Sequence, residues 1–438
     1  MSEAVSIERR PWLRAIGWIA LLGPFFFASY GFANWLAGRR SDVGAIAFGW
    51  EHAIPFVPWT ILPYWSIDLF YGLSLLICAT RRELDRHAQR LFAAQLISVT
   101  CFIAFPLRFS FDRPAAVDGV FGALFAALGS FDKPFNQAPS LHISLLVLIW
   151  MRLAAHSRPI WLRLVLHVWM LLVGVSVLTT YQHHFIDIPT GLAVGFAILW
   201  GLPDSSTSPP AGMALASDPQ RRRLAAIYAL GALFVAAPAL LGGAWLWMLW
   251  PAVSLCVVAL NYLAIGVRGF QKSAGGTMSA GAWGLLAPYF FGAWLNSRIR
   301  NAGRPKSGVV ADGVSVGRIR GPLDGDRASF ASVVDLSAEL PFAVARDQHY
   351  RSIPVLDLTV PPAGALREAV AAIEEARAGG PVLVCCAVGL SRSASAVVAW
   401  LVATGRAESV DDAIRIVREA RPSVVVHPGL RSALEELT

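Results

Sequence analysis

The sequence predicts a polytopic α-helical membrane protein that ends in a small α/β domain. Of its 438 residues, 55% are hydrophobic and only 15% are charged, whereas an average soluble domain is about 25% charged. Apolar runs close to the ~20 residues that a membrane-spanning helix needs fill most of residues 1–300. After about residue 308, short apolar segments alternate with helical patterns, which is typical of an α/β domain.

The first part of the chain, residues 1–203, is predicted to be a membrane domain of six helices. Each of its apolar runs is long enough to cross the hydrocarbon layer. A polar linker rich in serine and proline follows over residues 204–223. The six runs are approximately 15–37, 56–79, 91–107, 140–157, 162–181 and 185–202.

Residues 224–300 are predicted to add two or three helices. The stretch 224–267 contains no Asp, Glu, Lys or Arg and has room for two spans separated at Gly242–Gly243. The run 279–296 is shorter and contains a proline, so it either crosses the membrane or lies in its interface.

The distribution of arginines predicts the orientation. An N terminus on the inner side puts most inter-helix arginines on that side, as membrane insertion favours. Basic segments flank the 279–296 run on both sides, which favours an interfacial helix and a cytoplasmic C-terminal domain. Arginine far outnumbers lysine, and the composition suggests a bacterial protein of the inner membrane.

Three polar stretches, 105–114, 136–142 and 179–187, fall at the outer membrane face when the spans are counted. They predict phosphoryl transfer through histidine. His183 is the candidate nucleophile, and Asp187, one helical turn later, fixes its tautomer. His142 is the candidate acid for the leaving oxygen.

Arg108 and Arg113 are the candidate phosphate clamps in the first of these stretches, because guanidinium groups bind phosphate oxygens in a forked geometry. The alternative is a set of interfacial polar residues with snorkelling arginines. Ionisable groups within a membrane are costly and usually functional, which favours the catalytic interpretation for the set.

The motifs "PSLH" (139–142) and "HHFID" (183–187) resemble those of the type 2 phosphatidic acid phosphatase superfamily, and its inositol phosphorylceramide synthase-like branch in particular. The resemblance covers about residues 50–200. It implies the roles given above and adds Ser140 as a phosphate contact. Pro106 and Val177 stand where the broad family has a lysine and an arginine, so hydrolysis and head-group transfer both stay open.

The segment "CAVGLSR" (386–392) follows a short apolar strand and precedes a helix. Loop amides and a helix N terminus bind anions. Arg392 is predicted to clamp phosphate, Cys386 to attack as thiolate, and Gly389 to allow close backbone approach. Ser391 or Ser393 is expected to help the thiolate leave.

This segment resembles the dual-specificity branch of the cysteine phosphatases, and the resemblance covers about residues 310–438. It implies a general acid on an upstream loop. Asp357 fits, and Asp335 is the rival, although its place at the end of an early strand favours a structural role.

Two departures from that family bear on activity. Cys385 stands where the family has a histidine, which weakens thiolate formation or allows an oxidised pair with Cys386. The loop residues Ala387, Val388 and Leu390 are uncharged, which disfavours polyphosphorylated head groups. A monophosphate ester is expected, either a glycerol- or inositol-linked phosphate or a phosphoprotein.

The sequence therefore predicts a bifunctional membrane phosphatase with a membrane domain (1–203), a linker (204–223), additional helices (224–300) and a phosphatase-like domain (308–438). One alternative is a phospholipid head-group transferase with an accessory phosphatase. The other is a C-terminal domain that binds phosphorylated groups without turnover. The expected partners are a lipid phosphate and the membrane, and no metal, cofactor or nucleic acid is expected.

Overall fold

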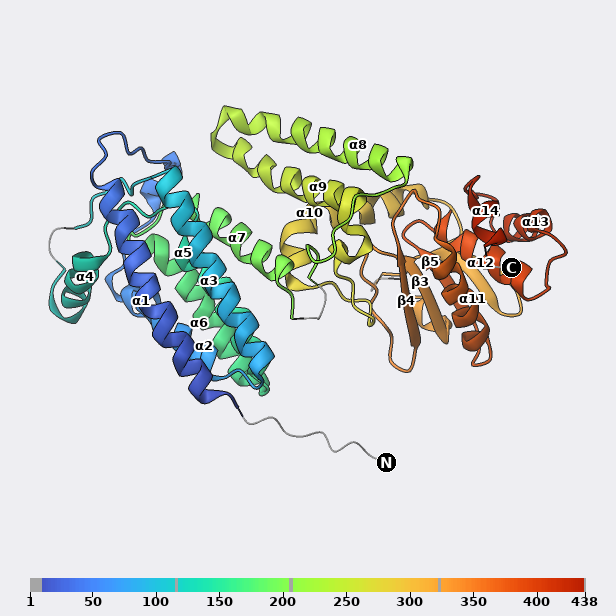
Figure 1. Cartoon of the computed structure of the whole chain (residues 1–438), viewed down its shortest axis with the longest axis horizontal. Coiled ribbons are helices and arrows are strands. Elements are labelled where there is room, and N and C mark those ends of the chain that lie inside the picture. Colours follow the sequence, from blue (N-terminus) through green and yellow to red (C-terminus); the bar gives the residue numbers. More distant parts are fainter. Residues whose placement is uncertain (1–9, 115–116, 205–207, 322–323, 437–438) are drawn as a thin grey trace. The chain divides into compact units, whose positions relative to one another are not determined.

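The computed structural model describes residues 10–114, 117–204, 208–321 and 324–436 (Figure 1). The chain divides into two compact units, Met1–Ser208 and Pro209–Thr438. The division falls inside the predicted linker.

The first unit is helical, and helices occupy all six predicted apolar runs. A short helix, α4, was not predicted. Two helix starts are capped by side chains, since Thr80 accepts from Glu83 N at 3.2 Å and Ser140 from Ile143 N at 3.3 Å. The helices are α1 (Trp12–Ala37), α2 (Ile61–Leu76), α3 (Arg81–Ala104), α4 (Gly119–Phe131), α5 (Leu141–His156), α6 (Ile160–Thr179) and α7 (Asp187–Gly201), with short 3-10 turns at Gly49–Ala53 and Pro58–Thr60.

Helices α5 and α7 pack closely because α7 carries glycine at the contact. A Cβ at Gly191 would lie 2.7 Å from the carbonyl oxygen of Ser140, and one at Gly195 would lie 2.8 Å from Cβ of Val147. Small residues allow such close approach between membrane helices. The contact brings the start of α5 next to the turn that precedes α7.

Four helical segments among the described residues are long and apolar enough to cross a membrane: Trp12–Ala37, Ile160–Thr179, Pro219–Leu241 and Gly243–Phe270. The remaining apolar helices of the first unit are shorter or more polar, so its six-helix membrane core stays a prediction.

The second unit begins with a helical segment, residues 219–300, in which α8 and α9 lie side by side (Figure 1). Helix α8 begins at Pro219, inside the predicted linker, with Asp218 as its cap. The elements are α8 (Pro219–Ala236), 3-10 turns at Ala237–Leu241 and Gly243–Met248, α9 (Leu249–Leu260), a π-helical turn at Asn261–Ile265, a 3-10 turn at Gly266–Phe270, and α10 (Ala280–Arg300).

A five-stranded sheet follows in the order β1-β2-β5-β3-β4. All neighbouring strands are parallel except the edge pair β1 and β2. The short apolar segments predicted after residue 308 form strands of this sheet. The strands are β1 (Ser307–Ala311), β2 (Val314–Arg318), β3 (Ser332–Ser337), β4 (His349–Val355) and β5 (Val382–Cys386), with a 3-10 turn at Arg327–Ser329.

Four helices cover one face of this sheet and α10 packs against the other. The first face carries the larger core, which includes Val384, Cys386 and Trp400. The second carries a smaller core with Leu383 and Cys385, against which Ala293 of α10 packs. The four helices are α11 (Ala363–Arg377), α12 (Arg392–Ala403), α13 (Val410–Ala420) and α14 (Leu430–Glu435).

The additional helices and the α/β domain, which the sequence separated at 300/308, thus belong to one compact unit. Both parts line one cavity in this unit, to which the α/β domain contributes four of the twelve lining residues and the helical segment the other eight.

Candidate active sites

The strand β5 lies at the centre of the sheet and is fully buried, and it ends at Cys386. The loop 387–391 then leads directly into α12. In open parallel sheets, ligands bind at the carboxyl ends of the strands. The topology therefore puts the Cys386 loop where a ligand site is expected.

Gly389 gives this loop its shape. Its φ of +74° lies in the left-handed region, and a Cβ there would lie 2.2 Å from the carbonyl carbon of Gly317. Only glycine fits both conditions. The resulting turn directs the Gly389 N–H to Cys386 Sγ at 3.3 Å.

The thiol of Cys386 has a second polar neighbour. Ser393 Oγ, in the first turn of α12, lies 3.4 Å from Sγ. Ser391 is the residue before α12, and its side chain makes no capping hydrogen bond. Of the two predicted serines, Ser393 is thus the one in contact with the thiol.

Arg392 is 1% exposed and is held by two carboxylates. Its Nη1 donates to Glu339 Oε2 at 2.7 Å and to the Val355 carbonyl at 2.9 Å. Its Nη2 lies 2.5 Å from Glu339 Oε1 and 2.9 Å from Asp357 Oδ1. Its Nε is buried and has no hydrogen-bond partner within the described residues.

The two carboxylates around Arg392 respond oppositely. Burial raises the pKa of Glu339, but the charge and hydrogen bonds of Arg392 outweigh burial and hold it below the ordinary value. Burial raises the pKa of Asp357 above its ordinary value; Arg392 opposes this shift and the charge of Glu339 adds to it. Asp357 is thus the carboxyl that holds a proton to higher pH.

Cys385 lies apart from this chemistry. Its side chain is on the opposite face of the sheet from Cys386, because side chains alternate along a strand. Both cysteines are free. Burial raises the pKa of Cys385 well above its ordinary value, which keeps this thiol protonated.

Asp335, the rival acid, is engaged elsewhere. Lys272 Nζ lies 2.6 Å from its Oδ2, and the Tyr350 hydroxyl donates to the same oxygen at 2.9 Å. The Ser337 N–H donates to Oδ1 at 2.8 Å. These contacts fit a structural role.

Three side chains hold the outward carbonyls of the Cys386 loop. Ser297 of α10 donates to the Ala387 carbonyl at 2.5 Å. Asn301, just after α10, donates to the Val388 carbonyl at 3.1 Å, and Arg421 Nε donates to the Gly389 carbonyl at 2.9 Å. The Asn301 amide oxygen also accepts from Arg421 Nη2 at 2.6 Å, so these supports form one network.

Residues 324–438 match the family described as dual specificity phosphatase, catalytic domain. This part of the chain is a dual-specificity phosphatase domain. The prediction of that domain is confirmed, and phosphoester hydrolysis is the chemistry that its family supports. The individual roles of Cys386, Arg392 and Asp357 remain predictions.

Several solved structures are similar to part of the chain, each covering 30% of it. Tk-PTP in its active form is 32% identical with 96% of that chain covered, and human DUSP28 is 31% identical with 93% covered. PTPMT1 in complex with PI(5)P is 20% identical with 94% covered. The TM-score is 0.28 in each case. None of the curated proteins matches the sequence.

The predicted histidine site lies in the first unit. His183 Nδ1 lies 3.0 Å from Asp187 Oδ2, and its Nε2 lies 3.2 Å from Ser140 Oγ. His142 and His183 line the same cavity of about 280 Å³. The structure therefore brings together four of the six residues proposed for this site.

The two arginines proposed as phosphate clamps lie between α3 and α4. Arg108 is exposed, and its backbone N–H donates to the Gly44 carbonyl at 2.8 Å. Arg113 is half-buried and its Nε donates to the Tyr181 carbonyl at 3.2 Å. Neither arginine lines the cavity of the two histidines.

Sequence reasoning missed several polar groups near these histidines. Asp132 lines the cavity and accepts a hydrogen bond from the Tyr30 hydroxyl at 2.9 Å. The buried Glu51 lies 2.9 Å from His184 Nδ1. An acid four residues before the "NQAPSLH" stretch was a usable signal for Asp132, whereas Glu51 is brought in only by the tertiary fold.

Cys386→Ser is expected to lower phosphomonoesterase activity by about 10⁴-fold, because a hydroxyl at this position is a far weaker nucleophile than a thiolate. Cys385→Ala serves as the matched control and should retain activity within a few-fold, since Cys385 faces the other side of the sheet. Phosphate release from an aryl phosphate by the full-length protein measures both. Equal losses in the two variants would contradict this assignment.

Asn301→Ala is expected to lower kcat by about tenfold or more and to destabilise the domain by about 1–3 kcal/mol, because the buried Val388 carbonyl loses its donor. Arg304→Ala, an exposed neighbour, is the control. As a positioning residue, Asn301 should also affect the inhibition constant of inorganic phosphate. A loss of stability with unchanged kcat and phosphate affinity would count against the role.

Proposed function

We propose that the C-terminal domain hydrolyses phosphate monoesters through a phosphocysteine on Cys386. The main observation that supports this proposal is the arrangement of the groups around Arg392. Its guanidinium is buried beside the loop, two carboxylates hold it in place, and its Nε remains without a protein partner among the described residues. Such a group is a preorganised phosphate clamp.

In the first step, phosphoryl oxygens accept hydrogen bonds from Arg392 Nε and from the loop amides. Asp357 then exchanges its contact with Arg392 Nη2, 2.9 Å long in this structure, for the leaving-group oxygen. Cys386 Sγ attacks phosphorus, the bond from phosphorus to the ester oxygen breaks, and Asp357 gives its proton to that oxygen.

In the second step, water attacks the phosphocysteine. The Asp357 carboxylate takes the proton of the water, the bond between sulfur and phosphorus breaks, and phosphate leaves. Ser393 Oγ, 3.4 Å from Sγ, donates a hydrogen bond to the departing thiolate.

The loop supports a substrate with a single phosphate group. Ala387, Val388 and Leu390 carry no charge that could bind a second phosphate. The candidates are an inositol- or glycerol-linked phosphate and a phosphoprotein. The competing function, a phosphate-binding domain without turnover, predicts that phosphate release does not exceed that of the Cys386→Ser variant.

Asp357→Asn tests the acid through the pH profile. An acid whose pKa is raised stays protonated to higher pH, so kcat/KM should fall only as pH rises through that pKa. In the variant, this fall of kcat/KM at high pH should disappear. Its kcat with an alkyl phosphate should be about 10²–10⁴-fold lower. Asp335→Asn should keep the fall at high pH. An unchanged fall in Asp357→Asn would refute the assignment.

A second function is proposed for the first unit: cleavage or transfer of a lipid phosphate through a phosphohistidine on His183. The contacts of His183 with Asp187 and Ser140, and the shared cavity with His142, support it. Asp187 orients the imidazole so that Nε2 faces the phosphate. The cavity has aromatic walls, including Tyr64, whose ring stacks on His142 with centroids 4.3 Å apart.

Trapping of the covalent intermediate tests this second function. A lipid phosphate labelled on phosphorus should leave an acid-labile label on the Cys386→Ser protein and none on the Cys386→Ser, His183→Ala protein. Asp187→Asn should slow labelling by about 10²-fold or more, because it destabilises the required tautomer. Label that survives His183→Ala would overturn the assignment.

Release of phosphate to water, or its transfer to a polyol, distinguishes the hydrolase from the head-group transferase. The arginine distribution supports a multi-pass inner-membrane protein with the His183 site outside and the phosphatase domain in the cytoplasm. The long apolar helices Trp12–Ala37, Ile160–Thr179, Pro219–Leu241 and Gly243–Phe270 support membrane insertion.

A further inference from the structure

A cavity of about 360 Å³ lies in the second unit between the helical segment 219–300 and the catalytic residues of the phosphatase domain. The phosphatase contributes Glu339, Asp357, Ala387 and Val388 to its lining. These include the proposed acid, the carboxylate that holds Arg392, and two residues of the Cys386 loop. The cavity thus borders the proposed acid and the Cys386 loop.

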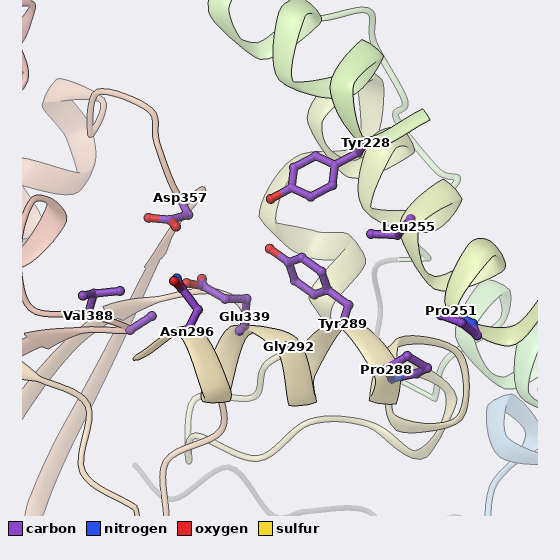
Figure 2. Close-up of a pocket in the computed structure, with 12 residues that line it drawn as sticks. Tyr228, Pro251, Leu255, Pro288, Tyr289, Gly292, Asn296, Glu339, Asp357 and Val388 are labelled. Carbon is purple, nitrogen blue, oxygen red and sulfur yellow. The ribbon is translucent and has the colours of Figure 1, made fainter. Parts of the chain in front are cut away.

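The helical segment supplies the opposite walls, and its residues change from polar to apolar along the cavity. Figure 2 shows the hydroxyls of Tyr228 and Tyr289 pointing toward each other near the carboxylates of Glu339 and Asp357. Leu255, Pro251 and Pro288 lie farther from those carboxylates. A ligand whose phosphate lies on the Cys386 loop would place a small polar group and then an apolar tail along this lining.

The helices around the apolar end are suited to a bilayer. Pro219–Leu241 and Gly243–Phe270 are both long and apolar enough to span one. Their outer surface carries large exposed side chains such as Leu233 and Phe234, which are 69% and 82% exposed. The apolar end of the cavity therefore adjoins the part of the second unit that matches lipid.

The helical segment also holds the loop that carries the acid. Tyr262 donates its hydroxyl to the Asp357 carbonyl at 2.9 Å, and Gln220 donates to the Leu358 carbonyl. Leu358 has a φ of +57°, so this loop is strained and needs such support. The same segment supports the Cys386 loop through Ser297, and Asn301, the residue directly after it, does so as well. Both catalytic loops thus depend on helices that do not belong to the matched family region 324–438.

We propose that α8, α9 and α10 form the acyl-chain side of the phosphatase site, so that the substrate is a phosphate monoester of a membrane lipid, with Tyr228 and Tyr289 at its head group. This inference rests on the proposed function and specifies its substrate. A phosphoprotein is the less favoured class, because a folded protein surface would have to reach Cys386 past helices that face lipid.

A chain-length series tests the proposal without assuming a head group. Butyl, dodecyl and hexadecyl phosphate are offered to the full-length protein in vesicles of a neutral diacyl phospholipid. The His183→Ala background removes hydrolysis by the first unit, and Cys386→Ser defines zero. We expect kcat/KM to rise at least tenfold from butyl to hexadecyl phosphate.

Gly292→Trp should remove the rise of kcat/KM with chain length. Gly292 lines the cavity, and a Cβ there meets no atom within 4 Å, so the helix tolerates the new side chain while the cavity is filled. Leu295→Trp adds the same bulk to the same helix, at a position that is 40% exposed and outside the cavity lining, and should preserve the series. Partition of long chains into vesicles affects both variants equally and so cannot produce the difference.

Tyr228→Phe provides a second variant that keeps the ring and its packing. It should lower kcat/KM for lyso-glycerophosphate lipids, which carry a free hydroxyl beside the phosphate, several-fold more than for hexadecyl phosphate.

Three results would overturn the lipid assignment: no dependence on chain length, a dependence that persists in Gly292→Trp, or a higher kcat/KM for a phosphotyrosine peptide than for hexadecyl phosphate. Failure of the underlying function looks different, because aryl phosphate hydrolysis would then equal that of Cys386→Ser.

Discussion

The buried guanidinium of Arg392 is the group on which the phosphatase site depends. A cation that is 1% exposed costs several kcal/mol unless its donors are paired. Glu339 follows β3, Val355 ends β4, and Arg392 opens α12 after β5, so one guanidinium joins the carboxyl ends of three parallel strands. The residue proposed to bind phosphate thereby also holds the loops around it together.

Burial raises the pKa of both carboxyls, but Glu339 and Asp357 share one guanidinium unequally, which explains why the pKa of Glu339 is lowered and that of Asp357 is raised. Glu339 makes two short contacts and keeps its charge, whereas Asp357 makes one contact, is 31% exposed and holds its proton more strongly. An incoming phosphate dianion competes best with the weaker contact. In the proposed mechanism, ligand binding therefore releases the carboxyl that is proposed as the acid.

Much of the phosphatase half could be predicted from the sequence because its signals are local. Short apolar runs mark the strands, and Ser409, a residue type common before a helix, caps α13 by accepting from Asp412 N at 3.1 Å. The Cys386–Arg392 spacing marks the loop.

Glu339 was missed because an acid after a strand resembles any surface residue, and only the fold brings it to Arg392. Arg108 was predicted from its position near the histidine motifs, but it does not line the cavity of His142 and His183. Sequence spacing does not determine the direction of a loop side chain.

The contacts of the Cys386 loop explain how Cys385 can replace the family's histidine. The resemblance assigns that histidine the task of orienting the catalytic loop. Here the side chain at 385 packs in the small core of the second face with Leu340 and Phe342. The loop is instead oriented from outside, through the carbonyls of Ala387 and Val388, by donors at the end of α10. With its carbonyls held outward, the loop directs an N–H to the Cys386 sulfur. In a phosphatase domain with helices fused before its first strand, those helices can thus supply the hydrogen bonds that hold the loop. The geometry of the proposed catalytic residues then depends on how the helices pack.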